Sequence, residues 1–452
     1  MNLPTPLPPP QPMASFGTHE RPFSPNSLWN SRPRQVKWAD VIIPPAQYFP
    51  RVGNGSFSTT AFLALPTDKA QRVYPPVGRP GVWDPDAEAH LPYVDIAKWP
   101  VATIPAAGSD GHADIVDPSA GLIHSFFQLR KIDGRWTATQ YAWTRLDGRG
   151  WGNGAHYFQG ARAAAVPSIA GVIRKHEIND GAPQYYHALA LSLTFNAMSP
   201  EVQYVYPATS GDTAYKANEG RIPMGALLML PPDFNTSTIT SQPLRKVANT
   251  LKTYGAYVVD RNYGTPFYVY VENGVAYDLH EGKWNNSVAT DLLRIREALR
   301  PVAQARDWVD GFEVSSIKLP PLNLMSMRGP WSPLKGSTVK PNYDSKTQRL
   351  VFGPTQKNET AENLSSRSFS GVTWAKPVPG RLYEFKVESP QGGRAYLRYW
   401  SNGVEQFNTR PIRHGESFRL IWPNVEGVPI LGVISGIGNR TEIRATFTEV
   451  VQ

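Results

Sequence analysis

The chain has 452 residues, of which 41% are hydrophobic and 11% aromatic, so it is long enough for two or three packed domains and too apolar to be disordered throughout. Its net charge of +9 is scattered rather than gathered into a basic run, which argues against nucleic acid and leaves an acidic polysaccharide as an anionic partner. Cysteine is absent, which excludes disulfides, thiol nucleophiles and zinc ribbons, and no apolar run approaches the roughly 20 residues of a membrane span.

The turn residues indicate the fold class. The 43 prolines and 37 glycines, together with few helical patterns, predict a mainly β protein. We expect a large, jelly-roll-like β-sandwich with a few peripheral helices at residues 21–314, a linker at 315–341 and a smaller β-sandwich at 342–452. The 13 tryptophans and 20 tyrosines either pack cores and hairpins or offer flat rings to sugars.

Residues 1–20 form a proline-rich arm that is expected to be extended. This arm is either a disordered tail or a segment that docks on a neighbouring subunit, such as a virion protein or another copy of the chain. It has neither the basic nor the apolar region of a signal peptide. An extracellular role would therefore need another route, and assembly into a virus particle released by lysis is one.

Two hairpins are predicted in the central region. The first joins 126–132 to 135–143 through an Asp-Gly turn, and the second joins 267–272 to 275–279 through an Asn-Gly turn. A further strand is predicted at 185–195, where every second residue falls on one face. His187 shares that face with three leucines, so an imidazole lies near the mouth of an apolar strand.

Two helices are predicted by apolar residues at helical spacing. The first stripe comprises Leu244, Val247, Leu251 and Tyr254, and the second comprises Leu292, Ile295 and Leu299. Thr290 is a candidate N-cap for the second helix, and Pro301 limits it. Two helices among so many strands should pack on the outside of the sheets.

The last 110 or so residues read as short, evenly spaced strands separated by Gly, Pro and Asn turns. The expected strands are 349–352, 381–387, 395–400, 417–422 and 442–448. This spacing is typical of a small β-sandwich.

Most signatures of catalysis are missing from the sequence. It contains no metal-binding motif, no Gly-x-Ser-x-Gly nucleophile elbow and no phosphate or dinucleotide loop. We therefore expect neither a metal nor another cofactor. Asp110, His112, Asp114 and Asp117 form either a weak oxygen-and-imidazole cluster or a simple Asp/Gly turn.

The remaining reactive groups are carboxylates, imidazoles, phenols and a guanidinium, and these suffice for cleaving a glycan. Hydrolysis uses two carboxylates, whereas elimination from a uronic acid uses a His or Tyr base and a cation. The predicted catalytic residues are Arg174, Glu177, His187 and Asp260. The predicted substrate-binding residues are His156, Tyr204, Tyr206, Asp212, Asp110 and His112.

Each of these residues also has a purely structural interpretation. Arg174 and Glu177 are three residues apart and suit a local ion pair. His187 suits a hydrogen-bonded core histidine, the two tyrosines suit strand packing, and Asp260 suits a turn. The sequence leaves both interpretations open.

Several short motifs follow one another in a fixed order between residues 21 and 313. They are FSPNSLWN at 23–30, DGH at 110–112, VDP at 116–118, GVIR at 171–174 with Glu177 and Gly181, HAL at 187–189, YPA at 206–208, PMG at 223–225 and YGAYVVD at 254–260. Together they resemble a family of large secreted bacterial proteins for which no activity is established, so the resemblance assigns no catalytic residue. The chain departs from that family in its proline-rich arm, where an export signal is usual. It also departs at 260–264, where DRNYG stands in place of Asp-Asn-Gly, and this bears on any role for Asp260.

The features together predict an exterior protein that binds a bacterial surface polysaccharide such as a capsule, an O-antigen or an exopolysaccharide. Cleavage of the bound polymer is favoured over binding alone. An arm, a β-rich body and a terminal sandwich are similar in architecture to a phage tail spike or depolymerase. One alternative is a non-enzymatic tail fibre, virion structural protein or adhesin. The other is a secreted bacterial polysaccharide-degrading enzyme. The expected location is the virion or the extracellular space.

Overall fold

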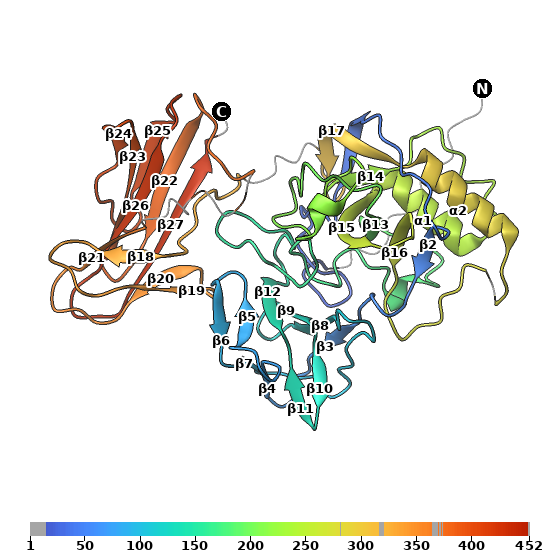
Figure 1. Cartoon of the computed structure of the whole chain (residues 1–452), viewed down its shortest axis with the longest axis horizontal. Coiled ribbons are helices and arrows are strands. Elements are labelled where there is room, and N and C mark those ends of the chain that lie inside the picture. The colour runs from blue at the N-terminus through green and yellow to red at the C-terminus, as the bar shows by residue number, and fades with distance from the viewer. Residues whose placement is uncertain are drawn as a thin grey trace.

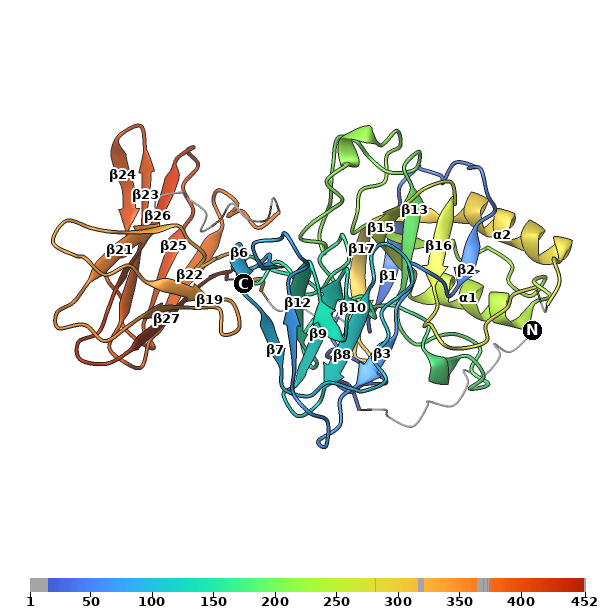
Figure 2. The same cartoon turned by 60° about the horizontal axis from the view of Figure 1, so that its bottom comes forward.

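The computed structural model describes residues 15–280, 282–315, 321–363, 369, 372 and 374–450. Strands dominate these residues and build β-sandwich-like layers, which confirms the predicted fold class. In Figures 1 and 2 the C-terminal strands form one block beside a larger one, and β6 (Ala89–Leu91) lies close to β19 (Asn342–Asp344) where the blocks meet. Residues 1–14, which are most of the predicted proline-rich arm, lie outside the described residues.

The larger block contains a mixed seven-stranded sheet in the order β1-β17-β14-β15-β13-β16-β2. Its strands are β1 (Arg32–Trp38), β2 (Arg51–Gly53), β13 (Leu189–Thr194), β14 (Leu227–Met229), β15 (Ala256–Asn262), β16 (Phe267–Tyr270) and β17 (Arg300–Val309). β13 runs parallel to β15, and β16 runs parallel to β2, while the remaining neighbours are antiparallel. The sheet therefore places residues that are far apart in sequence side by side.

The two α-helices, α1 (Gln242–Thr253) and α2 (Asn286–Ala298), pack against this sheet, and both predicted helices are confirmed. Their buried apolar residues belong to the same hydrophobic core as β13 and β15. The hydroxyl of Ser241 accepts the N–H of Leu244 and so caps α1. The expected N-cap at Thr290 is wrong, because the Asn285 side chain accepts the N–H groups of Ser287 and Val288 and begins α2 one turn earlier. Two short 3₁₀ turns are η1 (Lys175–Glu177) and η2 (Tyr215–Ala217).

The larger block also contains a sandwich of two sheets. The six-stranded sheet comprises β3 (Ala61–Leu63), β8 (Ala113–Asp117), β9 (Leu122–Phe127), β12 (Gln140–Arg145), β5 (Val82–Asp84) and β6, in that order. The four-stranded sheet comprises β10 (Arg130–Ile132), β11 (Arg135–Thr137), β4 (Gln71–Tyr74) and β7 (Val94–Ile96). Large rings fill the space between the sheets, and Trp99 lies 4.9 Å from Trp136 and 5.8 Å from Phe126, between ring centroids.

One predicted hairpin is confirmed and the other is wrong. Asp133 (φ 49°) and Gly134 (φ 77°) turn the chain between β10 and β11, while the outer parts of the same two segments pair as β9 and β12 in the other sheet. No strand occurs among residues 275–279 of the described chain. The neighbouring loop holds this segment instead, since the Asn54 side chain donates to the carbonyl of Val275 and the free edge of β16 is taken by β2.

The strand predicted at 185–195 is shorter than expected. β13 begins at Leu189, and all six of its residues are buried because it lies inside the sheet with its two faces covered. His187 precedes the strand rather than sharing one of its faces.

The C-terminal block is a sandwich of two five-stranded sheets. One comprises β18 (Trp331–Pro333), β21 (Thr360–Asn363), β26 (Val428–Ile434), β23 (Arg394–Ser401) and β24 (Val404–Asn408), and the other comprises β19, β20 (Arg349–Phe352), β27 (Thr441–Glu449), β22 (Leu382–Glu388) and β25 (Ser417–Ile421). All five predicted strands are present to within one residue at each end. In β22, Tyr383, Phe385 and Val387 alternate into the core. Residues 324–327, from the segment expected to be a linker, are buried against that core.

Candidate functional site

A cleft of about 930 Å³ lies between the seven-stranded and the six-stranded sheet. Aromatic residues make up much of its wall, namely Phe57, Trp83, Phe127, Phe158, Tyr263, Tyr268 and Tyr270. Four of the ten predicted site residues also line it, namely Asp110, His112, Asp212 and Asp260. Apolar walls with a few converging polar groups are typical of ligand-binding sites. We therefore take this cleft as the candidate functional site.

A β-bulge in β15 gives Asp260 its position. Leu191 pairs with Val258 and Ser192 with Asp260, so Val259 is an extra residue on β15 and the strand turns locally. Asp260 Oδ2 accepts a hydrogen bond of 3.2 Å from Nη1 of Arg162, whose side chain is 1% exposed. The bulge thus brings a carboxyl group to a buried guanidinium at the wall of the cleft.

Arg162 is held in place by several contacts. Its Nη1 also donates to the carbonyl of Phe57 at 3.0 Å, and its guanidinium carbon lies 3.9 Å from the centre of the Tyr270 ring. Its Nη2 is buried without a hydrogen-bond partner within the described ranges. A buried donor without a partner is unusual in a folded protein.

The acidity of Asp260 suits proton transfer. Burial raises the pKa of Asp260 to about 6, the charge of Arg162 opposes this, and the charge of Asp110 adds to it. A carboxyl group with such a pKa still holds a proton in mildly acidic solution and can act as a general acid.

Asp110 and His112 face the same cleft from the turn before β8. The carboxylate of Asp110 lies 3.7 Å from Nε2 of His112, and 31% of its side chain is exposed. Burial holds the pKa of His112 well below its usual range, so its ring is neutral near pH 7. Gly111 between them has φ 48°, and a Cβ there would come within 1.7 Å of Arg130 Nη1. The turn thus depends on glycine.

The metal cluster considered for this turn is not formed. Asp114 accepts the N–H of Ile169, and Asp117 accepts those of Ser119 and Ala120. Among the residues that the structure describes, no three His, Cys, Asp or Glu side chains are arranged to hold a metal ion.

Asp212 and Arg261 lie at the rim of the cleft. Asp212 Oδ1 accepts the N–H of Ala214 at 2.7 Å, and Arg261 Nη1 donates to the carbonyl of the same residue at 2.8 Å. Arg261 Nη2 donates to the hydroxyl of Tyr263 at 2.7 Å, while its Nε is buried without a partner in the described part of the chain. The rim therefore contains a second buried donor without a partner.

Three other predicted residues, Arg174, Glu177 and His187, line a separate cavity of about 200 Å³. Arg174 does not pair with the Glu177 carboxylate through its guanidinium. Its Nε donates to Glu272 Oε2 at 3.1 Å, and its Nη1 donates to the carbonyl of His19 at 2.7 Å. Glu177 Oε2 instead accepts the backbone N–H of Arg174 at 2.8 Å and lies 3.2 Å from His187 Nε2.

The surroundings of His187 favour its charged form. Its Nδ1 lies 2.8 Å from the carbonyl oxygen of Ala188, and its Nε2 faces the carboxylate of Glu177, so both ring nitrogens meet acceptors. The carboxylate accordingly raises the pKa of His187 against the effect of burial. Glu177 is also buried, but His187 and the hydrogen bonds that it accepts lower its pKa to about 2. The pair is thus a satisfied ionic contact.

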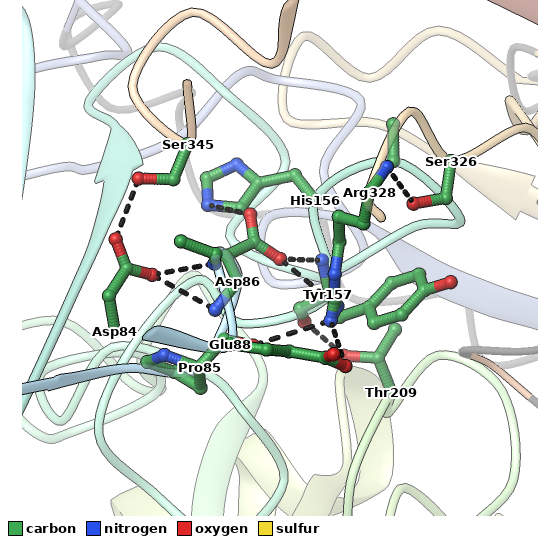
Figure 3. A network of polar contacts seen from close by, with 12 residues as sticks. Asp84, Pro85, Asp86, Glu88, His156, Tyr157, Thr209, Ser326, Arg328 and Ser345 are labelled. Atoms are coloured by element: carbon green, nitrogen blue, oxygen red, sulfur yellow. Dashed lines mark hydrogen bonds and ion pairs between the residues drawn. The ribbon is translucent and has the colours of Figure 1, made fainter. Parts of the chain in front are cut away.

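His156 lies where the two blocks meet, in the polar network of Figure 3. Its Nε2 is 3.5 Å from Asp86 Oδ2, and Asp86 Oδ1 is 3.7 Å from Nη1 of Arg328, which comes from the C-terminal side. Ser345 donates to Asp84 at 2.6 Å from the same side. Burial lowers the pKa of His156 to about 4, so this ring is neutral and bridges the blocks rather than facing a ligand.

Tyr204 and Tyr206 also lie at this junction. Tyr204 packs against the core of the seven-stranded sheet and against the C-terminal core. The ring of Tyr206 is 5.2 Å from that of Trp374 at 88°, and its hydroxyl accepts a hydrogen bond from Arg149. The ten predicted residues thus divide among the cleft, the small cavity and the junction.

Sequence reasoning missed Arg162, Arg51 and the aromatic walls of the cleft. Arg162 carried one usable signal, because it is a single charge in the apolar segment GARAAAV at 160–166, and a charge that is buried with such a segment needs a partner. The partner itself could not be found in this way, since Asp260 is 98 residues away.

The comparisons with known proteins identify no family. No family model and no curated protein matches the chain. Among solved structures, accessory secretory proteins 1, 2 and 3 of Streptococcus pneumoniae match with 9% identity over 25% of this chain and 86% of theirs, at a TM-score of 0.19. The carbohydrate-binding module TmCBM61 in complex with β-1,4-galactotriose matches with 12% identity over 27% of this chain and 89% of its own, at 0.18. Tailspike protein 4 of bacteriophage CBA120 matches with 16% identity over 26% of this chain and 19% of its own, at 0.17. Similarities this low assign neither a fold family nor a ligand.

In the described residues, neither helix has the length and apolar character needed to cross a membrane.

Proposed function

We propose that the chain binds a polysaccharide in the cleft between the two sheets. The observation that carries this proposal is the combination, in one cleft, of flat aromatic rings with Asp260, Asp110 and Arg162. Sugars present an apolar face to a ring and hydroxyl groups at their edge, so rings and charged hydrogen-bonding groups are what hold them.

We further propose that the bound chain is hydrolysed. Asp260, which holds its proton up to about pH 6, donates that proton to the leaving glycosidic oxygen. Asp110 is the second carboxylate and takes a proton from the water whose oxygen attacks the anomeric carbon. Arg162, which lines the cleft and donates to Asp260, keeps that carboxyl group in place.

The proposed substrate is a bacterial surface polysaccharide, such as a capsule, an O-antigen or an exopolysaccharide. These polymers lie outside the cell, so the proposed place of action is a virion or the extracellular space. In this setting residues 1–20 would attach the chain to a neighbouring subunit.

The second candidate function is adhesion without cleavage, as in a tail fibre. The observation that favours it is the ion pair of 3.2 Å between Arg162 and Asp260, because a paired carboxylate is a good acceptor for hydrogen bonds and a poor proton donor.

The test is a panel of purified capsular polysaccharides, O-antigens and exopolysaccharides incubated with the full chain. Binding is measured on a glycan array, and cleavage is measured as new reducing ends. We expect binding and shortening of at least one polymer, and a fall in rate of about 100-fold or more in both Asp260→Asn and Asp110→Asn with binding retained. Binding without new reducing ends selects adhesion, and no binding to any polymer contradicts both functions. New ultraviolet absorbance from unsaturated uronates would select elimination and would move the role of base to His112.

A further inference from the structure

A second hollow, of about 380 Å³, adjoins the cleft. Arg51 of β2 lines both, and its guanidinium carbon lies 5.4 Å from the centre of the Tyr268 ring in the cleft wall. Tyr48, from the wall of the hollow, donates its N–H to the carbonyl of Gly264 at 2.7 Å, directly after Tyr263 at the rim of the cleft. The hollow and the cleft therefore share a wall.

Large aromatic rings are exposed around this hollow. Trp284 is 59% exposed, Tyr48 58% and Phe49 44%. Single exposed apolar residues are ordinary, but several around one hollow indicate a surface that binds something. Since Arg51 lines both the hollow and the cleft, the occupant to be expected is the same molecule that fills the cleft.

The rings are held in fixed orientations before any ligand arrives. Trp284 stacks on His280 with 4.6 Å between ring centroids and 18° between ring planes, and Phe49 stands at 70° to Trp284 with 5.1 Å between centroids. The indole Nε1 donates to Asn286 at 2.9 Å, and His280 Nδ1 accepts the N–H of Asn285 at 3.1 Å. A platform that is already ordered costs little entropy on binding.

Polar groups line the hollow together with the rings. Arg51, Asn54 and Asp278 line the same hollow. Asp278 carries a negative charge, since the N–H groups of His280 and Gly282 that it accepts lower its pKa. A ring face with charged and amide groups beside it matches the apolar face and the hydroxyl edge of a pyranose.

We infer that this hollow is a remote subsite for the polysaccharide proposed to occupy the cleft. The inference rests on the proposed function and narrows it, because it makes the ligand a chain of several sugars that extends past Arg51. Pockets of about 300–1,000 Å³ enclose whole small molecules, and the cleft alone lies in this range. A small ligand would therefore not need the second hollow. The site therefore selects for chain length, and the units on Trp284 are bound without being cleaved.

The test compares Trp284→Ala with the wild-type protein on an oligosaccharide ladder, from disaccharide to decasaccharide. The ladder is prepared by partial acid hydrolysis of the polysaccharide that the array identifies, and affinities come from titration calorimetry. We expect Trp284→Ala to bind the longest oligosaccharides about tenfold more weakly, to bind the shortest ones as the wild type does, and Trp284→Phe to recover most of the loss. Phe418→Ala, which removes a 37% exposed ring from the C-terminal sheets, is the matched control and should change neither.

Equal affinities of Trp284→Ala and wild type at every length would overturn the inference while leaving the proposed function in place. The same loss at every length would also overturn it, because the tryptophan would then act on the cleft. If the wild type binds no polymer at all, both the inference and the proposed function fail. Melting curves of the three variants show whether the fold is kept.

Discussion

The cleft and the small cavity hold the same kinds of side chain, yet they differ in how those side chains are satisfied. In the cavity, Arg174 is bound by Glu272 and His19, and His187 is bound by Glu177 and the carbonyl of Ala188. In the cleft, Arg162 Nη2 has no partner in the described ranges, and Asp110 keeps 31% of its side chain exposed. Residue type alone therefore did not separate the cavity from the cleft, whereas the partners of their polar atoms distinguish these two regions.

The pKa values of the carboxyl groups also distinguish the cavity from the cleft. Glu177 in the cavity has a pKa lowered to about 2, so its charged form stabilises the fold. Asp260 in the cleft has a pKa raised to about 6, so its charged form costs stability. Groups held at such a cost are the ones expected at a functional site. The predictions below test this contrast, in order of their expected effect on the free energy of unfolding.

Glu272→Ala should have the largest effect. Arg174 and Glu272 have side chains only 4% and 3% exposed, and removing one partner leaves a buried charge alone, which costs about 3–5 kcal/mol. Urea denaturation measures the loss. The matched control is Asp147→Ala, which breaks the exposed pair with Arg145 and should cost no more than about 1 kcal/mol. Similar losses in both variants would remove the distinction between the cavity and the surface.

Glu177→Gln should change how stability depends on acidity. The pKa of Glu177 lies near 2 in the folded chain and near 4.5 otherwise, so its contribution is complete above pH 4.5 and is lost as the pH falls toward 2. The contribution is on the order of 3 kcal/mol. Unfolding curves collected from pH 2 to 7 should show a steeper loss for the wild type than for the variant, and parallel curves would contradict the assignment.

Asp260→Asn should change the dependence of stability on pH in the direction opposite to that of Glu177→Gln. The folded pKa of about 6 exceeds the ordinary value of 3.8, so the wild type loses stability as the pH rises from 3.8 to 6, by an amount on the order of 3 kcal/mol. The variant lacks this decline. If cleavage is found, its rate in the wild type should fall about tenfold per pH unit above pH 6, because the acid form becomes scarce. A rate that stays constant to pH 8 would exclude Asp260 as the acid.

Asp110→Asn should have the smallest effect on stability, within about 0.5 kcal/mol, because the side chain is partly exposed and the His112 ring beside it is neutral. The same variant should lose cleavage. A melting temperature well below that of the wild type would assign Asp110 to the scaffold instead.

Sequence patterns predicted the elements in which buried and exposed residues alternate regularly. They failed for elements without such an alternation. The C-terminal strands and both helices were found because one face of each is apolar. The start of β13 was misplaced because both of its faces are buried and its alternation carries no information about burial. The candidate site was only partly predictable. Asp110 and Asp260 stood out as chemistry-bearing residues, but the pairing of Arg162 with Asp260 depends on a contact across 98 residues and on a bulge that no local pattern announces.

The junction of Figure 3 bears on how the chain can be shortened in the laboratory. Pro85 in the wall of the cleft lies between Asp84 and Asp86. Ser345 of the C-terminal block donates to Asp84, and Arg328 of the same block pairs with Asp86. Cutting the chain after residue 315 would therefore strip the support from one side of the cleft and leave Asp86 buried without its cation. A trimmed fragment would be a poor reagent for glycan assays, and expression should keep the two blocks together.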